Sequence, residues 1–139
     1  MECFKIMITV HGENVIWYLS TETEVESDHK AFQYLSSEIN IQEWKEQYLN
    51  LYKKWLHNED DRIYQIANPV NMQMINALIA VNLKFKDFKL YYWFDIDRDK
   101  HPDYIWEKCP LSNSDLDHLS GDFHENNKKF SLMFPLVFP

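Results

Sequence analysis

A row of carboxylates follows the most strand-like stretch of the chain. Asp95, Asp97 and Asp99 alternate with other residues in the segment FDIDRDKHPD, and Asp103 closes it. Alternating carboxylates can hold a metal ion, act as acid and base in hydrolysis, or present negative charge to a basic partner. Each of these chemistries needs different neighbouring residues, and the neighbours separate the three interpretations.

A calcium loop fits this segment poorly. A loop of the EF-hand type that begins at Asp95 needs glycine at its sixth position and glutamate at its twelfth. The chain has Lys100 and Trp106 there, and Glu107 comes one position late. The segment also follows a predicted strand, whereas the EF-hand loop lies between two helices. We therefore expect no bound metal ion.

Two other arrangements for metal-dependent chemistry are also weak. Glu107 and Lys108 are adjacent, so on a strand their side chains point in opposite directions and cannot form the spaced Glu-x-Lys pattern of metal-dependent nucleases. A second polar cluster contains residue types that bind metals, at Asp115, Asp117, His118, Asp122 and His124. Its spacing matches no metal motif, so solvated loop residues are the simpler interpretation.

The counts of glycine and cysteine exclude several kinds of site. Only two glycines occur in 139 residues, so the chain lacks the glycine-rich loops that bring backbone close to a nucleotide phosphate. The two cysteines, Cys3 and Cys109, are too few for a disulfide framework. No serine or cysteine has the sequence context of an activated nucleophile. We expect no cofactor, and an enzyme is the less favoured class.

The charge balance bears on the partner. The net charge is −8, from 14 basic and 22 acidic residues. This excess argues against DNA or RNA as a partner, because phosphate binding depends mainly on Lys and Arg, and against an anionic membrane surface. The first ten residues contain no basic region, and no apolar run reaches membrane-spanning length. We therefore expect a cytoplasmic protein that binds neither nucleic acid nor membrane.

The elements that must position the carboxylates follow from hydrophobic periodicity. The predicted strands are residues 3–10, 15–20, 86–97 and 128–138, and the predicted helices are about 28–39, 41–56 and 69–84. This order predicts a single α+β domain over residues 1–139, with a mostly antiparallel sheet of about four to five strands and about three helices packed on one face. The last of these helices has no continuous polar face, so we expect it to be the most buried.

Local signals predict where the helices begin. Ser27 or Asp28 is expected to cap the first helix, and Asn40 the second. Pro69 is expected at the first position of the third helix. In the last strand, Pro135 indicates an edge or an end of the sheet, because proline has no N–H to donate to a neighbouring strand.

Alternation along residues 90–97 assigns the side chains to two faces. The predicted core face contains Leu90, Tyr92, Phe94 and Ile96, and the opposite face contains Tyr91, Trp93, Asp95 and Asp97. An outward face with two large aromatic side chains beside two carboxylates is typical of an interaction surface. The predicted partner-binding residues are therefore Tyr91, Trp93, Asp95, Asp97, Asp99 and Asp103.

Protein binding is the function that this pattern favours. Between Phe94 and Asn127 the chain has nine acids and three bases, so most of the net charge follows the strand with the aromatic pair. The pattern predicts an inhibitor that imitates nucleic acid and blocks a basic, nucleic-acid-handling protein, such as a toxin nuclease or an effector. Immunity proteins and phage anti-defence proteins are the classes that this description suits.

Two other classes remain open. One is a metal-assisted hydrolase that uses Asp95, Asp97, His118 and His124 in the segment 95–124. The other is a structural subunit in which Tyr91 and Trp93 form a homodimer contact. Metal analysis, together with sizing at two concentrations, separates both classes from the inhibitor.

Overall fold

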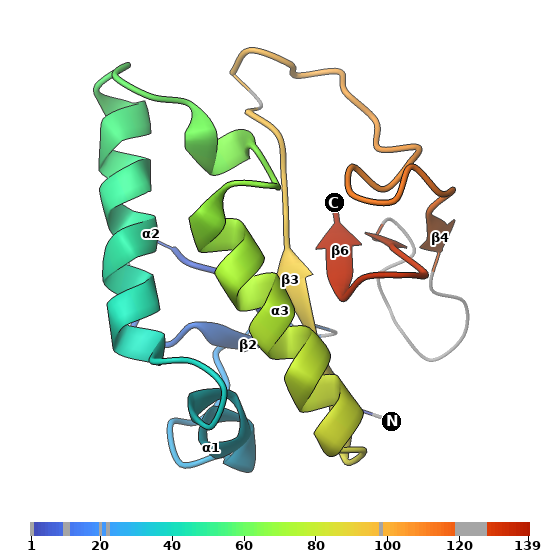
Figure 1. The fold of residues 1–139 in the computed structure, drawn as a ribbon. Helices are drawn as coiled ribbons and strands as arrows, with labels where there is room; N and C mark the ends of the chain where they lie inside the picture. Colours follow the sequence, from blue (N-terminus) through green and yellow to red (C-terminus); the bar gives the residue numbers. More distant parts are fainter. Residues whose placement is uncertain (1, 10–11, 20, 22, 98, 119–127) are drawn as a thin grey trace.

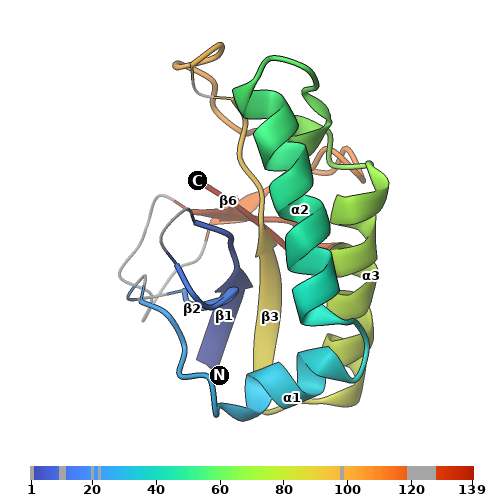
Figure 2. The same cartoon turned by 90° about the vertical axis from the view of Figure 1, so that its left-hand side faces the viewer.

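The computed structural model describes residues 2–9, 12–19, 21, 23–97, 99–118 and 128–139. These residues form three α-helices and one six-stranded sheet. All three helices lie on the same side of the sheet (Figures 1 and 2). The predicted α+β class, with three helices on one face, is therefore confirmed. No helix in the described part of the chain is long and apolar enough to cross a membrane.

The sheet is mixed. Its strands are β1 (Glu2–Ile6), β2 (Ile16–Tyr18), β3 (Phe88–Trp93), β4 (Asp117–His118), β5 (Lys129–Phe130) and β6 (Leu136–Phe138), and they lie in the order β2-β1-β3-β6-β5-β4. The central pairs β1/β3 and β3/β6 are parallel, and the outer pairs are antiparallel. The prediction of a mostly antiparallel sheet missed the parallel centre, because the helical crossover between β2 and β3 returns the chain alongside β1 in the same direction.

The helices fill that crossover. They are α1 (Lys30–Ser36), α2 (Ile41–Leu56) and α3 (Pro69–Lys84), with the short 3-10 helix η1 (Arg62–Tyr64) between the last two. As predicted, α3 is the most buried, since six of its residues are buried against one in α2 and two in α1. Figure 2 shows α2 and α3 side by side over the sheet. The main core therefore lies between these helices and the strands β1, β3 and β6.

The predicted starts of α2 and α3 are confirmed. The side-chain oxygen of Asn40 accepts a hydrogen bond from the backbone N–H of Glu43 at 3.0 Å. The side-chain oxygen of Asn68 accepts one from Asn71 at 2.9 Å, and Pro69 occupies the first turn. These bonds satisfy backbone N–H groups that have no partner within the helix.

The predicted cap of α1 is wrong. The helix is capped by His29, whose Nδ1 accepts a hydrogen bond from the backbone N–H of Ala31 at 3.0 Å, and not by Ser27 or Asp28. The His29 ring also packs edge-on against Phe4, with ring centroids 5.1 Å apart. Contact with Phe4 of β1 therefore helps to fix the start of this short helix. The residues around position 29 do not reveal this contact, because Phe4 is distant in the sequence.

The C-terminal segment also differs from the prediction. Residues 128–138 form two antiparallel strands, β5 and β6, where one strand was expected. β6 lies inside the sheet between β3 and β5, and not at an edge. Pro135 lies in the turn directly before β6, and its carbonyl accepts a hydrogen bond from the backbone N–H of Tyr92 at 2.7 Å. A proline that precedes the strand removes no hydrogen bond from it, so an interior position is compatible with the sequence.

One side chain completes the central strand. The Asn82 side chain, on α3, donates to the carbonyl of Leu90 and accepts from its N–H, both at 2.9 Å. β6 pairs with β3 only from Tyr92 onward, so Leu90 has no neighbouring strand on that side. Asn82 therefore supplies the two hydrogen bonds that a strand would otherwise make there, and it ties α3 to β3.

Candidate functional site

The side of the sheet that faces away from the helices is partly covered by the chain itself. Tyr91 is only 8% exposed, and its ring lies edge-on to Phe130 with centroids 5.1 Å apart. Leu19 and Val137 are buried in the same small cluster. The prediction that Tyr91 lies on an open outward face is therefore wrong, because residues of the outer strands and their connections form a second apolar layer there. A homodimer contact through Tyr91 is obstructed for the same reason.

Trp93 lies on this second face between two lysines. The Lys5 Nζ is 4.5 Å from the ring centroid, and the Lys128 Nζ is 5.4 Å from it. Both lysines are buried, Lys5 completely. An ammonium group above an indole ring is attracted to its π electrons. Trp93 therefore packs against cations of its own chain, which the alternation pattern did not indicate.

Asp97 is buried and faces α2. Because β3 ends at Trp93, the alternation does not continue to this residue. Its Oδ2 accepts a hydrogen bond from the Trp55 indole at 3.0 Å, and its Oδ1 accepts one from the backbone of Asp99 at 3.1 Å. Burial alone would raise the pKa of the Asp97 carboxyl, but these hydrogen bonds, with one from the Lys100 backbone, hold the pKa below its usual value.

The six predicted partner-binding residues are therefore not one surface. Tyr91 and Trp93 lie on the second face, Asp97 is buried against α2, and Asp95 is half-buried with its Oδ1 accepting a hydrogen bond from the Ile96 backbone at 2.7 Å. Asp99 and Asp103 are exposed. All six were predicted to be exposed to a partner, and only Asp99 and Asp103 are.

The structure adds other acids to Asp99 and Asp103. The loop after α2 contains Glu59, Asp60 and Asp61, and it lies at the same end of the molecule as the segment after β3 (Figures 1 and 2). Residues of both segments line one shallow hollow: Trp55, Asn58, Glu59, Asp60, Asp61 and Lys100. We call Glu59, Asp60, Asp61, Asp99 and Asp103 the acidic end.

Among the described residues, most carboxylates of the acidic end form no ion pair. Within the described residues, no Lys or Arg forms an ion pair with Glu59, Asp61, Asp99 or Asp103, whereas Asp60 pairs with Arg62 at 2.6 Å. In the described part of the chain, other ion pairs join Lys30 with Asp87, Lys84 with Glu38 and Lys108 with Asp115. The acidic end therefore gathers five carboxylates, with Lys100 in the same hollow, and among the described residues only Asp60 forms an ion pair.

Two apolar side chains are exposed along the same segment. Tyr104 is 43% exposed and Ile105 is 69% exposed, and both follow directly after Asp103. The Tyr104 ring lies edge-on to the buried Trp106, with centroids 5.0 Å apart. This contact holds one side of the Tyr104 ring against the fold. The exposed parts of Tyr104 and Ile105 therefore form an apolar surface next to Asp103 in the chain.

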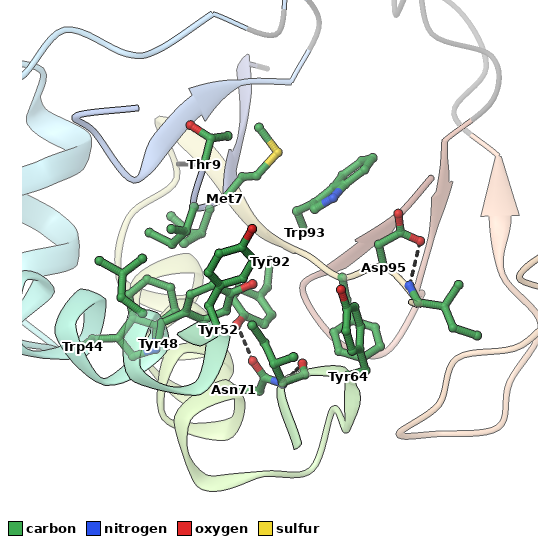
Figure 3. Close-up of a pocket in the computed structure, with 16 residues that line it drawn as sticks. Met7, Thr9, Trp44, Tyr48, Tyr52, Tyr64, Asn71, Tyr92, Trp93 and Asp95 are labelled. Carbon is green, nitrogen blue, oxygen red and sulfur yellow. Dashed lines mark hydrogen bonds between the residues drawn. The ribbon is translucent and has the colours of Figure 1, made fainter. Parts of the chain in front are cut away.

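A cavity of about 220 Å³ opens between α2, η1 and the ends of β1 and β3 (Figure 3). Trp44, Tyr48 and Tyr52 line it from successive turns of α2, Tyr64 lines it from η1, and Asp95 lines it beyond the end of β3. The cavity lies where two parallel strands end, and this is the edge at which sheets with parallel strands commonly bind ligands.

Some polar groups of the cavity serve the fold. The Tyr92 hydroxyl donates a hydrogen bond to the Asn71 side-chain oxygen, and the Trp44 indole donates one to the Val70 carbonyl at 3.0 Å. The Asn71 amide donates in turn to the Gln65 carbonyl at 3.0 Å. These hydrogen bonds join α3 to β3, to α2 and to the end of η1, so the groups that make them are already occupied.

Three tyrosines of the cavity are different. Within the described part of the chain, no residue forms a hydrogen bond with the hydroxyl of Tyr48, Tyr52 or Tyr64. Burial raises the pKa of Tyr48 to about 12, with a smaller contribution from Tyr52. Burial likewise raises the pKa of Tyr64 to about 12, helped by the negative charges of Asp97 and Asp95. Tyr48 and Tyr64 are therefore neutral at physiological pH and can both donate and accept hydrogen bonds.

The sequence contains a signal for this cavity in an aromatic stripe along α2. Trp44, Tyr48, Tyr52 and Trp55 recur along α2 at spacings of four, four and three residues. A stripe that only fills a core has little use for repeated hydroxyl groups, because buried polar atoms need partners. Tyr64 lay in a segment that the periodicity did not assign, and only the tertiary structure brings it to α2.

Among the described residues of the hydrolase hypothesis, Asp95 and Asp97 follow β3, whereas His118 lies in another strand. His118 lies in β4, three strand positions from β3 in the sheet order, which corresponds to about 14 Å between the strands. Asp122 and His124 lie outside the described residues. In the part of the chain that the structure describes, no group of three or more His, Cys, Asp or Glu side chains is placed to hold a metal ion.

Comparison with known proteins gives no match to a family model, to a curated protein or to a solved structure. The geometry of the acidic end and of the cavity is therefore the basis for the function.

Proposed function

We propose that this protein binds a basic protein partner through its acidic end and thereby covers a nucleic-acid-binding surface of that partner. The observation that supports this proposal is the convergence of two segments, about 40 residues apart in the sequence, whose exposed carboxylates mostly form no ion pair with another described residue. Such an inhibitor would act as an immunity protein or an anti-defence protein does, and the cytoplasm is its expected location.

The acidic end would act on its partner mainly through electrostatic attraction. Uncompensated carboxylates that lie within about 10 Å of one another act together on an approaching cationic surface, because screening at physiological salt extends over a similar distance. They accelerate association with a basic protein and repel the polyanion that competes for the same site. Carboxylates that are already neutralised by lysine, such as Asp87, contribute far less to this field.

The proposal retains Asp99 and Asp103 from the predicted surface and changes its apolar part. Tyr104 and Ile105 take the role that the alternation gave to Tyr91 and Trp93, because they are the exposed apolar side chains of this segment. Tyrosine is among the residue types that contribute most to binding energy at protein interfaces. We therefore expect the carboxylates to govern the association rate and Tyr104 to slow dissociation.

Two double variants with the same net charge test the proposal. Asp99→Asn with Asp103→Asn removes two carboxylates of the acidic end, and Glu13→Gln with Glu46→Gln removes two exposed carboxylates elsewhere. Both raise the net charge of −8 by two. Immobilised wild-type protein and both variants would be used to capture partners from the source cells, with identification by mass spectrometry. Binding kinetics against the captured protein would then be measured at low and high salt.

The acidic-end variant should associate at least about fivefold more slowly than wild type, and the control variant should not. The association rate of wild type should also fall as salt rises, because salt screens the carboxylates. Equal rates for the two variants, or a captured partner that is itself acidic, would overturn the proposal.

A further inference from the structure

The cavity between α2 and η1 has an aromatic wall. The rings of Trp44 and Tyr48 have centroids 5.4 Å apart. Tyr52 lies 5.6 Å from Trp55, which in turn lies 5.4 Å from Tyr64 and edge-on to it. Figure 3 shows the labelled tyrosines grouped where α2 and the 3-10 helix approach the ends of the strands. A guest in this cavity would therefore contact ring faces and edges over much of its surface.

One carboxylate lines the cavity, and two lysines, Lys5 and Lys128, lie against the ring of Trp93, which also lines it. Among the described residues that line it, Asp95 is the only charged one, and none is Lys, Arg or His. Asp97 lies just behind the wall, where it accepts the hydrogen bond from Trp55. The two carboxylates also raise the pKa of Tyr64, so their negative potential reaches the cavity. Asp95 is therefore the lining group that would interact favourably with a cationic guest.

The unused hydroxyls indicate where the guest makes hydrogen bonds. The hydroxyls of Tyr48, Tyr52 and Tyr64 form no hydrogen bond with a described residue, although the three side chains line a partly enclosed space. Each hydroxyl oxygen can accept a hydrogen bond from an N–H group. The cavity thus combines π faces, hydroxyl acceptors and a carboxylate, which are the groups that proteins use to bind ammonium and guanidinium ions.

We propose that this cavity binds a small organic cation, a guanidinium or alkylammonium group on a short apolar stem. Its volume of about 220 Å³ corresponds to about seven water molecules, so a guest of similarly few heavy atoms fits. Two sources carry this chemistry: a free amine of low molecular mass, and an arginine or lysine side chain of a polypeptide. The proposal is independent of the acidic end, because none of its carboxylates lines the cavity.

The test uses n-butylguanidinium and its neutral isostere n-butylurea, with binding followed by calorimetry and by tryptophan fluorescence. We expect n-butylguanidinium to bind at least about tenfold more tightly than n-butylurea, because only the cation gains from the ring faces and the carboxylate. Asp95→Asn should weaken binding of the cation by about tenfold and leave that of the urea unchanged. Asparagine can still accept the hydrogen bond from Ile96, so the local backbone is preserved.

Two Tyr→Phe variants separate the hydroxyl from the ring. Tyr64→Phe keeps the aromatic wall and removes one acceptor, so it should weaken binding of n-butylguanidinium severalfold. Tyr34→Phe is the matched control, because the Tyr34 hydroxyl bonds to Asp87 far from the cavity, and it should bind as wild type does. Thermal melts of each variant establish that it is folded.

A peptide with one arginine between glycines distinguishes the two sources. Tighter binding of this peptide than of n-butylguanidinium would assign the cavity to a polypeptide side chain, and weaker binding would assign it to a free amine. Equal affinity for n-butylguanidinium and n-butylurea, no binding of either, or an Asp95→Asn variant that binds the cation as well as wild type would overturn the proposal.

Discussion

The indole Nε1 of Trp55 donates a hydrogen bond of 3.0 Å to Oδ2 of Asp97, and this bond joins the last turn of α2 to the segment that follows β3. The bond links the acidic end to the cavity. Trp55 lines the hollow at the acidic end, and its ring contacts Tyr64, which lines the cavity. Asp97 was predicted to contact a partner, but its geometry instead gives it a positioning role.

Asp97→Asn should lower the Tm at pH 7. Hydrogen bonds from Trp55 and from backbone N–H groups stabilise the ionised carboxyl and hold its pKa below the usual value. A depressed pKa in the folded state adds stability above the pKa of the unfolded chain, near 4, and this stability is lost as pH falls through the folded value. Melts of wild type and variant at pH 7 and pH 3 should therefore show a smaller acid-induced decrease for the variant.

Asp103→Asn is the control for this measurement. Asp103 is an exposed carboxylate of the same segment, with no hydrogen bond to any described residue. Its variant should show the same acid-induced decrease in Tm as wild type. If Asp97→Asn also behaves as wild type at both pH values, the Trp55–Asp97 bond does not stabilise the fold.

Asn82→Ala should destabilise the protein by about 2 kcal/mol. The substitution leaves both the N–H and the carbonyl of Leu90 without a partner in a partly buried place, and each unsatisfied buried group costs about 1 to 3 kcal/mol. Urea denaturation would measure the change. Asn76→Ala, at an exposed position of the same helix, should leave the free energy of unfolding unchanged or slightly raised, since alanine favours a helix.

Ile75→Asp should abolish cooperative unfolding, whereas Ile79→Asp should leave a folded protein. Both isoleucines lie on α3, but Ile75 is completely buried and Ile79 is only half-buried beside a surface hollow. An unpaired carboxylate in the core costs more than about 4 kcal/mol, while at the rim it retains water. Circular dichroism melts of the two variants would decide, and a cooperative melt of Ile75→Asp would show that α3 does not form the core.

Ile105→Ser should change the free energy of unfolding by less than about 0.5 kcal/mol. The Ile105 side chain is 69% exposed, so serine there removes few packing contacts. A thermal melt provides the measurement, and a large decrease in stability would show that Ile105 packs within the fold and does not serve a partner.

The local signals in the sequence were sufficient for much of the fold. The caps at Asn40 and Asn68, the burial of α3 and the inward set that contains Leu90, Tyr92 and Phe94 were all predicted, and the structure confirms them. Each of these features depends on residues three or four apart on a helix, or two apart on a strand. Such spacings are fixed by backbone geometry and do not require knowledge of distant contacts.

Tertiary structure alone decided what lies on the second face and where the exposed carboxylates gather. Alternation correctly placed Tyr91 away from the helices, but the chain returns with Phe130 and Leu19 and buries it. The acidic end arises because the turn after α2 and the segment after β3 meet, although Asp61 and Asp99 are far apart in sequence. A periodic pattern shows which side chains share a face, while burial depends on which distant segment packs against that face.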